Sequence, residues 1–375
     1  MFHRQRVLWL IKGLARGGAE RLVSVMAPKI DRAHFEVEVA YLAPEADAFV
    51  PDLEGAGIRV HCLDARGNIE PGWPARLRRL LHEGRYDIVH SHSPLAGSVA
   101  RLVAPRRTHH FYTEHNLWSV YRWPTFAVNT VTYARNERIF AVSGGVAASI
   151  ARPWWSRLGR MPPVEVLLHG VDVDSAPRGR EARVAARTRL GISPDVPLIG
   201  NVANFSPKKD QATLLRAFET VRERIPDALL LLIGMGPLED QLRKTVRDLG
   251  ATDSVRFLGS RDDVTELLPA LDVFVLSSTH EGLPISLLEA MAAGVACVCT
   301  AVGGIPEALR DGVDGRLVPP ARSDVLAEVL REVMLDAAQR QRLGSNGLAR
   351  VSGEFDLSRA VARLERQYAA IDQQP

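Results

Sequence analysis

The sequence predicts an α/β protein made of two doubly wound parallel-sheet domains that face each other across a cleft. Strand-like and helix-like segments alternate through both halves of the 375-residue chain, and this alternation is interrupted once, at residues 173–189. Alternating strands and helices are typical of βαβ units, which form parallel sheets. The length also suffices for two domains of ordinary size, and the default ligand site of such a pair lies between them.

The first half begins with a buried strand. Residues 7–11 are a continuous apolar run, which is typical of a strand covered on both faces of its sheet. A loop containing glycines, residues 12–18, leads from it into a helix-like segment, residues 19–26. Further strands are predicted at residues 37–42, 58–63, 87–92 and 138–143. We therefore expect an N-terminal domain over residues 1–175.

The second half repeats the pattern after a polar interruption. Residues 173–189 are rich in Arg and Ala and contain Pro177 and Gly179, so we interpret them as the interdomain connection. A C-terminal domain is expected over residues 185–357, and the terminal segment 358–375 is expected to pack back on the first domain as a helix. The predicted strands of the second domain are residues 198–202, 229–233, 255–258, 273–276, 295–300 and 315–318, with helices at 210–224 and 237–249.

Charge is distributed unevenly along the chain. Residues 1–180 carry 24 Lys and Arg against 17 Asp and Glu, whereas residues 181–375 carry 23 against 27. A basic half is typical of a protein with an anionic partner, such as an acidic membrane face or a phosphorylated acceptor. A solvated Arg-rich surface explains it equally well. A membrane-docking surface would consist of the basic Arg76, Arg78, Arg79, Arg106 and Arg107 with the apolar Trp118, Trp123, Trp154 and Trp155. The tryptophans fit the core or an acceptor pocket equally well.

Cysteine content and hydropathy point to a cytoplasmic protein. The three cysteines have no metal-ligand spacing, and a reduced compartment fits them. The first apolar run, residues 7–11, is too short for a signal peptide or a membrane span. We expect a cytoplasmic protein, and peripheral contact with the inner face of an anionic membrane stays open.

The most informative segment is EGLPISLLE, residues 281–289, which joins a predicted strand to a predicted helix. Pro284 suits the first helical turn, where its missing N–H would have no partner. The amides of that turn would face the carboxyl edge of the sheet, where a phosphate is stabilised. Glu281 precedes the helix, and Glu289 is expected about two turns inside it. The segment thus combines amide donors for a diphosphate with two separated carboxylates for sugar hydroxyls.

Eight short motifs of this chain resemble those of the family-four retaining glycosyltransferases, which have the GT-B fold of two facing Rossmann-like domains. Each motif alone is weak, but their order and spacing are specific and span nearly the whole chain. They are GGAE at 17–20, DIVHSH at 87–92, AVS at 141–143, HGVD at 169–172, NFSPKK at 204–209, GMGP at 234–237, EGLPISLLE at 281–289 and GGIPE at 303–307. Two positions depart from the family pattern: His169 replaces the usual Asn, and Asn204 replaces a frequent Arg.

The resemblance implies transfer of a sugar, with retention at the anomeric carbon, from a nucleoside-diphosphate sugar to a glycan or lipid-linked acceptor. The N-terminal domain would hold the acceptor and the C-terminal domain the donor. The implied setting is the assembly of a cell-surface polysaccharide or glycolipid. The resemblance implies displacement on the front face of the sugar, without a dedicated protein nucleophile. It also implies that the reaction uses no metal ion or other cofactor and that no nucleic acid is a partner.

The resemblance also implies roles for individual residues. Lys209 would face the diphosphate, Glu281 the transferred sugar and Glu289 the ribose, since one carboxylate accepts two hydroxyl hydrogen bonds. The expected catalytic residues are His115, Glu281 and Lys209; the expected donor-binding residues are Asn204, Lys209, Gly282, Leu283, Ile285 and Glu289; the expected acceptor or phosphate loop contains Gly17, Gly18 and His92.

Structural explanations remain for each of these residues. Lys209 fits a solvated lysine at a helix start, Glu281 a surface acid and Glu289 a partly exposed helix residue. Gly17 and Gly18 fit a plain strand-to-helix turn, and a single histidine is more often structural than catalytic.

Two other functional classes also stay open. A nucleotide-sugar epimerase on the same fold would release a free epimerised sugar nucleotide, and a non-catalytic binding protein would bind the donor without turnover.

Overall fold

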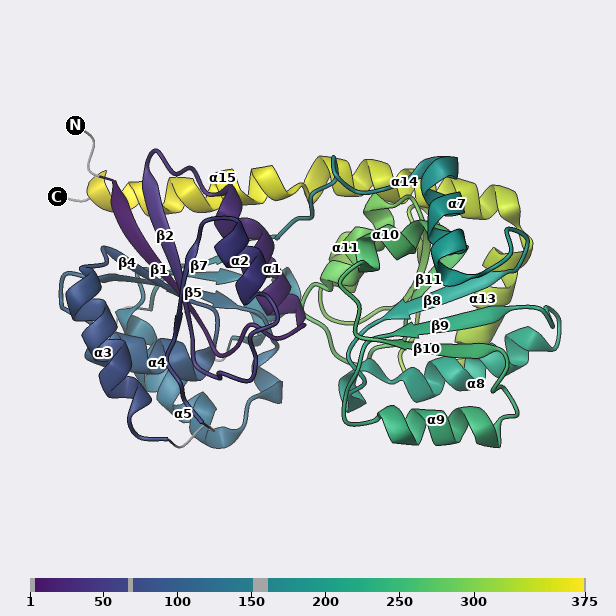
Figure 1. Cartoon of the computed structure of the whole chain (residues 1–375), viewed down its shortest axis with the longest axis horizontal. Helices are drawn as coiled ribbons and strands as arrows, with labels where there is room; N and C mark the ends of the chain where they lie inside the picture. The colour runs from purple at the N-terminus through teal and green to yellow at the C-terminus, as the bar shows by residue number, and fades with distance from the viewer. Residues whose placement is uncertain (1–3, 67–69, 151–160, 374–375) are drawn as a thin grey trace. The chain divides into compact units, whose positions relative to one another are not determined.

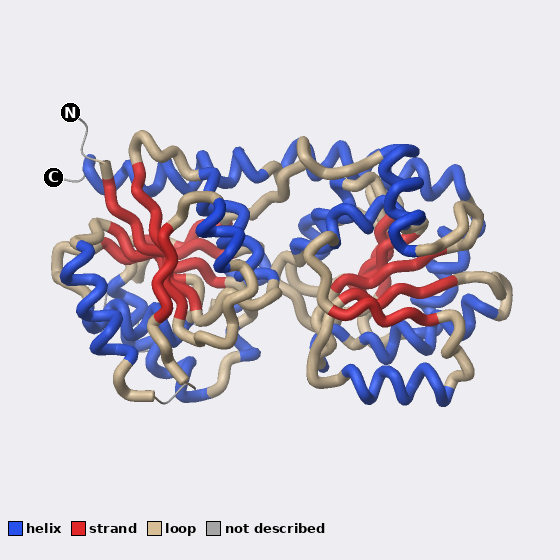
Figure 2. The backbone as a smooth tube through the Cα atoms, viewed as in Figure 1, coloured by secondary structure: helices blue, strands red, loops and turns tan. Residues whose placement is uncertain are grey.

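The fold is that of a computed structural model, which describes residues 4–66, 70–150 and 161–373 (Figure 1). The chain divides into two compact units. The first contains residues 1–169 and 358–375, and the second contains residues 170–357. Each unit has a parallel sheet with helices on its faces (Figure 2). The prediction of two doubly wound parallel sheets is therefore confirmed.

The first unit contains a seven-stranded sheet in the order β3-β2-β1-β4-β5-β6-β7. The strands are β1 (Gln5–Ile11), β2 (Phe35–Tyr41), β3 (Arg59–Cys62), β4 (Ile88–Ser91), β5 (His109–Glu114), β6 (Arg138–Ala141) and β7 (Val164–Val166). The helices are α1 (Gly18–Met26), α2 (Val50–Gly55), α3 (Trp73–Gly84), α4 (Pro94–Val103), α5 (Trp123–Thr132), α6 (Gly144–Ser149) and α15 (Leu357–Ala369). The apolar run of β1 is fully buried because β1 is a central strand.

The second unit contains a six-stranded sheet in the order β10-β9-β8-β11-β12-β13. The strands are β8 (Leu198–Val202), β9 (Leu229–Ile233), β10 (Val255–Gly259), β11 (Val273–Leu276), β12 (Ala296–Thr300) and β13 (Arg316–Val318). The helices are α7 (Gly179–Leu190), α8 (Gln211–Arg222), α9 (Glu239–Asp248), α10 (Val264–Leu267), α11 (Ile285–Ala292), α12 (Ile305–Ala308), α13 (Ser323–Leu335) and α14 (Ala337–Glu354).

Each sheet reverses its strand order next to its first strand. In the first unit the reversal lies between β1 and β4, and in the second it lies between β8 and β11. Loops at the carboxyl ends of the two strands diverge at such a point, and ligands of doubly wound sheets bind there. The fold therefore directs attention to one edge of each sheet.

The predicted connection at residues 173–189 is wrong over its second half, where α7 forms instead. Ala and Arg favour helix, and Arg183 and Arg187 lie one turn apart on α7. Both guanidinium groups bind the carboxylate of Asp272, at 2.7 and 3.0 Å, and both donate to backbone carbonyls of residues 269–271. These contacts hold α7 against the segment before β11 within the second unit.

The remaining differences from the predicted elements are small. Most predicted strands are confirmed with shifts of one or two residues at their ends, which is the usual uncertainty of such boundaries. Two strands of the first unit, β5 and β7, have no counterpart among the predicted ranges, and the three residues of β7 are only half-buried. None of the helices in the described part of the chain combines the length and the apolar character that a membrane span requires.

Candidate functional site

Lys209 and Glu281 meet at the point of the second sheet where the strand order reverses. Lys209 lies on the loop after β8, and Glu281 lies on the loop after β11. Lys209 Nζ donates to both carboxylate oxygens of Glu281, at 2.6 and 2.8 Å. The Lys209 side chain is 15% exposed and that of Glu281 only 6%, so water screens this ion pair weakly. Two residues 72 positions apart in sequence thus form one weakly screened ion pair.

The hydroxyl of Ser278 joins this ion pair, and the three residues are called the Lys209–Glu281–Ser278 cluster below. Ser278 Oγ donates to Glu281 Oε1 at 2.6 Å, and the backbone carbonyl of Ser278 accepts from Thr300 Oγ1 at 2.6 Å. Ser278 was not among the predicted site residues. Its only signal in the sequence is its position two residues past the end of β11. With Lys209 and Ser278 as donors, the carboxylate of Glu281 is fixed in one orientation.

Glycines next to β12 determine how closely the Glu281 loop is packed. Gly303 has φ +55°, and any Cβ at this position would overlap the carbonyl oxygen of Glu281. The amide of Gly304 donates to the carbonyl of Gly282 at 2.6 Å. The GGIPE motif therefore has a structural reason, since a side chain at Gly303 would displace Glu281.

Helix α11 begins one residue later than predicted. Pro284 is extended, with ψ 121°, and caps the helix from outside, so Ile285 is the first helical residue. Glu289 is the fifth residue of α11, which corrects its position to slightly more than one turn inside, and it is half-buried. Leu283 and Ile285 have buried side chains, so only their backbone amides are available to a ligand. Within the described part of the chain these two amides find no acceptor.

Asn204 lies on the loop after β8, five residues before Lys209, and its side chain is exposed. Its backbone carbonyl accepts from Gln211 Nε2 at 3.1 Å. The loop packs tightly against the GMGP segment, because Gly234 has φ +140° and a Cβ there would overlap the carbonyl oxygen of Ala203. The two glycine-dependent loops together shape the carboxyl edge of the second sheet.

The predicted residues of the first unit gather at the carboxyl edge of its sheet. Gly17 caps α1 and Gly18 is its first residue, at the end of the loop that follows β1. His92 follows β4, the neighbour of β1, and its amide donates to the carbonyl of Leu10 at 2.8 Å. His115 follows β5, the next strand, and its Nε2 lies 3.1 Å from Nδ1 of His92. The sheet thus brings the two histidines into direct contact.

Both histidines are held as neutral imidazoles. Burial lowers the pKa of His92 well below its usual range, and the nearby His90 adds to the effect. Burial also lowers the pKa of His115, followed by the influence of His92 and His169. A neutral imidazole has one donor and one acceptor nitrogen, so the His92–His115 contact is one hydrogen bond between unlike nitrogens.

Glu114 anchors the segment that follows His115 and was not predicted. Its buried carboxylate accepts from Trp118 Nε1 at 2.7 Å and from the hydroxyl of Tyr121. Burial raises the pKa of Glu114 to about 7. Trp118 is itself buried, so of the two places expected for it, a membrane-facing surface and the interior, the structure shows the interior.

Other members of the proposed basic surface are only partly available. The guanidinium of Arg76 donates to the carbonyls of Leu63 and Asp64, at 2.7 and 2.8 Å, so Arg76 is committed to the fold. The remaining predicted arginines are exposed: Arg78, Arg79, Arg106 and Arg107. Trp123 is 78% exposed. Trp154 and Trp155 lie outside the described residues.

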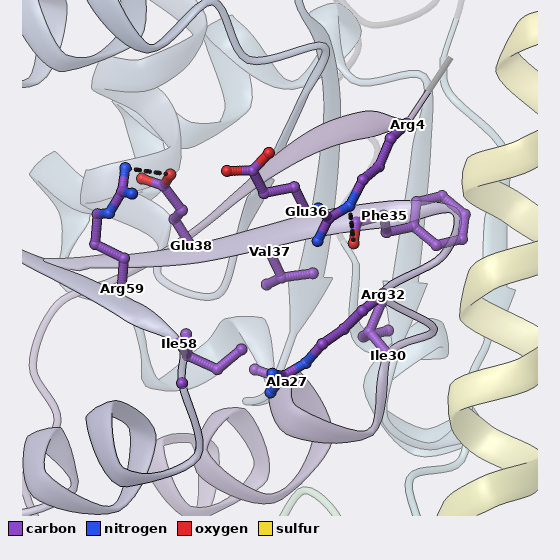
Figure 3. Close-up of a pocket in the computed structure, with 11 residues that line it drawn as sticks. Arg4, Ala27, Ile30, Arg32, Phe35, Glu36, Val37, Glu38, Ile58 and Arg59 are labelled. Atoms are coloured by element: carbon purple, nitrogen blue, oxygen red, sulfur yellow. Dashed lines mark hydrogen bonds and ion pairs between the residues drawn. The ribbon is translucent and has the colours of Figure 1, made fainter. Parts of the chain in front are cut away.

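A separate charged hollow opens at the amino ends of β2 and β3 in the first unit (Figure 3). Glu38 is one of the residues that line it, and its side chain is only 3% exposed. Arg6 and Arg59 bind one carboxylate oxygen, at 2.9 and 3.0 Å. His61 and the hydroxyl of Tyr86 bind the other, each at 2.6 Å. This cluster lies at the edge opposite the predicted site and is structural in character.

Two doubly wound parallel sheets define a class of α/β proteins whose ligands, nucleotides among them, bind where the strand order reverses. Comparison with known proteins is more specific. The family described as "Glycosyl transferases group 1" matches residues 183–350, and the family described as "Glycosyl transferase 4-like domain" matches residues 6–166.

Relatives of known name agree with these matches. D-inositol 3-phosphate glycosyltransferase of Actinosynnema mirum is 31% identical over 76% of this chain and 73% of its own length. A GDP-mannose-dependent alpha-(1-6)-phosphatidylinositol monomannoside mannosyltransferase of Mycolicibacterium smegmatis is 28% identical over 88% of this chain and 89% of its own. The solved structure of Anabaena HepE in complex with UDP-glucose has a TM-score of 0.85, with 24% identity, 97% of this chain and 99% of that chain covered.

The chain belongs to the group 1 glycosyltransferases, and it is a glycosyltransferase of the GT-B fold. The expectation drawn from its eight motifs is thereby confirmed at the level of family and reaction class. The two other classes, epimerase and non-catalytic binding protein, are not favoured, because the relatives named above are transferases.

Proposed function

We propose that this enzyme transfers a sugar from a nucleoside-diphosphate sugar to a glycan or lipid-linked acceptor, with retention at the anomeric carbon. The observation that carries the proposal is the Lys209–Glu281–Ser278 cluster beside the amino end of α11. It combines a cation and free amides, which stabilise a diphosphate, with a fixed carboxylate, which binds sugar hydroxyls. Relatives named for GDP-mannose and a neighbour solved with UDP-glucose support a sugar nucleotide as donor.

The proposed roles follow from charge. Negative charge grows on the diphosphate as its bond to the sugar breaks, and Lys209 with the amides of Leu283 and Ile285 stabilises it there. Glu289 binds the ribose, and Glu281 holds the sugar in place. His115 lies near the reacting sugar, and the Gly17–Gly18 turn with His92 faces the acceptor. Because protein groups alone supply the compensating charge, the proposed reaction needs no metal ion or other cofactor.

A thermal-shift screen tests the donor class. UDP-, GDP- and ADP-sugars are compared with the matching nucleoside monophosphates, and one sugar nucleotide is expected to raise the melting temperature most. Turnover with that donor is then followed in the presence and absence of EDTA and is expected to be equal. The anomeric configuration of the product is read by NMR. No shift with any sugar nucleotide, or an inverted product, would contradict the proposal.

The Glu289→Ala change tests the ribose contact. The loss of a charge-assisted hydrogen bond, worth roughly 1.5–3 kcal/mol, should weaken donor binding about tenfold or more. Calorimetric titration measures the affinity. Glu328→Ala, which removes an exposed glutamate from α13 of the same unit, is the matched control and should leave the affinity unchanged. Equal affinities for the two variants would remove Glu289 from the donor site.

We further propose peripheral contact of the first unit with an anionic membrane surface. Helix α4 packs against both α3 and α5, and these helices carry exposed apolar residues. Arg78 and Arg79 lie on α3, and Arg106 and Arg107 lie on the loop after α4. Leu102, Trp123 and Val131 are 56%, 78% and 73% exposed. Exposed apolar side chains beside cations suit the boundary between lipid headgroups and acyl chains.

Co-sedimentation with anionic liposomes tests this contact. The Arg106→Ala/Arg107→Ala variant should bind roughly 30-fold more weakly at low salt, since each basic residue contributes about 1 kcal/mol. Arg224→Ala/Arg247→Ala, which removes two exposed arginines of the second unit, is the control and should bind as the wild type does. Binding should also fade at high salt. If the wild type fails to bind at low salt, the arginines form an ordinary solvated surface.

A further inference from the structure

Tyr368 brings a polar group from the end of the chain into the centre of the first unit. It lies on α15, which runs beside β1 and β2 (Figure 1), and it is completely buried. Its ring packs edge-on against Phe35, Phe111 and His90, with centroid distances of 5.7, 5.2 and 5.8 Å. A phenylalanine would satisfy all of this packing. The hydroxyl therefore needs an explanation of its own, since burial of a hydroxyl is unfavourable unless it is hydrogen-bonded.

The hydroxyl has two partners, and their chemistry fixes the direction of each bond. Trp9 Nε1 lies 3.0 Å away and can only donate. The hydroxyl of Tyr368 accepts from Trp9, and within the described residues the one acceptor beside its own buried proton is His90 Nδ1, so it donates to His90. Burial lowers the pKa of His90 to about 3, and the imidazole is neutral. With Nδ1 as acceptor, His90 carries its proton on Nε2, which donates to Thr113 Oγ1 at 2.7 Å.

The fixed rings of His90 and Trp9 in turn hold His92. The His90 ring stacks on the His92 ring at 4.4 Å with an interplanar angle of 28°, and the Trp9 ring lies 5.1 Å from the same ring. His92 Nδ1 then contacts His115 Nε2. One hydroxyl thus holds both rings against which His92 packs, and His92 is the direct partner of His115.

We propose that Tyr368 is a positioning residue for His115, acting through Trp9, His90 and His92. The inference rests on the proposed role of His115 near the reacting sugar. It assigns to the C-terminal helix a part in the chemistry that packing alone would not require. The hydroxyl selects one tautomer of His90 and one orientation of the stacked imidazoles, and His115 is aligned as a result.

The Tyr368→Phe variant tests the inference, because it keeps the ring and removes the hydroxyl. Turnover is expected to fall about tenfold, the equivalent of one lost hydrogen bond, while the donor KM stays within about twofold. Histidine ¹⁵N NMR reads the tautomer directly. The wild type should show His90 protonated on Nε2 alone, and the variant should show a mixture of the two tautomers. Thr113→Val should lower turnover as Tyr368→Phe does, and Thr113→Ser should restore it.

Tyr133→Phe is the matched control. Tyr133 is another buried tyrosine of the first unit, packed against Tyr112 and Trp118, and its hydroxyl has no hydrogen-bond partner within the described residues. Its removal should change neither turnover nor the His90 signals. The inference is overturned if Tyr368→Phe leaves turnover or the His90 tautomer unchanged. If His115→Ala still lowers turnover in that case, the proposed site itself stands. A harmless His115→Ala change would instead remove the proposed site itself, and the inference with it.

Discussion

Replacement of Lys209 by Met should lower turnover by roughly 100- to 1,000-fold, the usual cost of removing one group that stabilises developing negative charge. Donor affinity should fall much less, because the charge on the diphosphate grows mainly in the transition state. Met keeps most of the aliphatic stem of Lys209 and removes only the ammonium group. Single-turnover measurements at saturating donor separate the two effects.

Two variants make the result interpretable. Lys209→Met leaves the buried carboxylate of Glu281 without its cation, so part of the loss comes from a disturbed Glu281. The Lys209→Met/Glu281→Gln pair removes that charge and isolates the contribution of the ammonium group. Lys208→Ala, at the exposed neighbouring lysine, should leave turnover near the wild-type value. If Lys208 were the damaging position instead, the assignment of Lys209 to the diphosphate would be wrong.

The Glu38→Ala change should have the largest effect on stability. It should lower the free energy of unfolding of the first unit by about 3 kcal/mol or more at pH 7, because Arg6 and His61 lose a buried partner. Glu36→Ala is the control on the same strand: its carboxylate is 37% exposed and lies 3.8 Å from Arg6, so its removal should cost less than about 1 kcal/mol. Figure 3 shows both residues on β2.

The pH dependence gives Glu38 a second signature. Hydrogen bonds from His61 and Tyr86 and nearby positive charge outweigh the opposing effect of burial, and they lower the pKa of Glu38 from 4.5 to about 2. A lowered carboxylate pKa contributes stability that is present above about pH 4.5 and is lost as the pH falls towards 2. The difference between wild type and Glu38→Ala should therefore shrink across that interval.

Tryptophan fluorescence is a suitable probe for these measurements. All six tryptophans of the chain lie at or before residue 155, so denaturant unfolding followed by their emission reports on the first unit and not on the second. A constant difference between the wild type and Glu38→Ala from pH 7 to pH 2.5 would show that folding leaves the pKa of Glu38 unchanged, and it would contradict the lowered value.

The sequence predicts the central strands well because their chemistry is local. Residues 7–11 are apolar throughout, and a strand covered on both faces requires that pattern. Helix α7 was missed because its position depends on Asp272, about 85 residues further along the chain. Judged by its own composition alone, this segment has the features of a polar connection. β7 is too short and too exposed to carry a pattern of its own.

The candidate site divides in the same way. Short motifs were sufficient to select Lys209, Glu281 and Glu289, since each motif is contiguous in sequence. The pairing of Lys209 with Glu281 depends on β8 lying beside β11, and the sequence of neither strand shows which strand is its neighbour. The pairing of His92 with His115 depends in the same way on β4 lying beside β5. Residues outside every motif, such as Ser278 and Tyr368, are recognised only from their contacts.

The return of the chain to the first unit has a consequence for biosynthesis. About 200 residues separate the last residue of the N-terminal segment from Tyr368. A ribosome that adds about 5–20 residues per second needs roughly 10–40 s to cover that distance. Throughout that time the nascent first unit lacks α15, and the aromatic face formed by Trp9, Phe35 and Phe111 has no cover from that helix. Chains whose synthesis stops early therefore expose an apolar surface, and we expect chaperones and proteases to bind them.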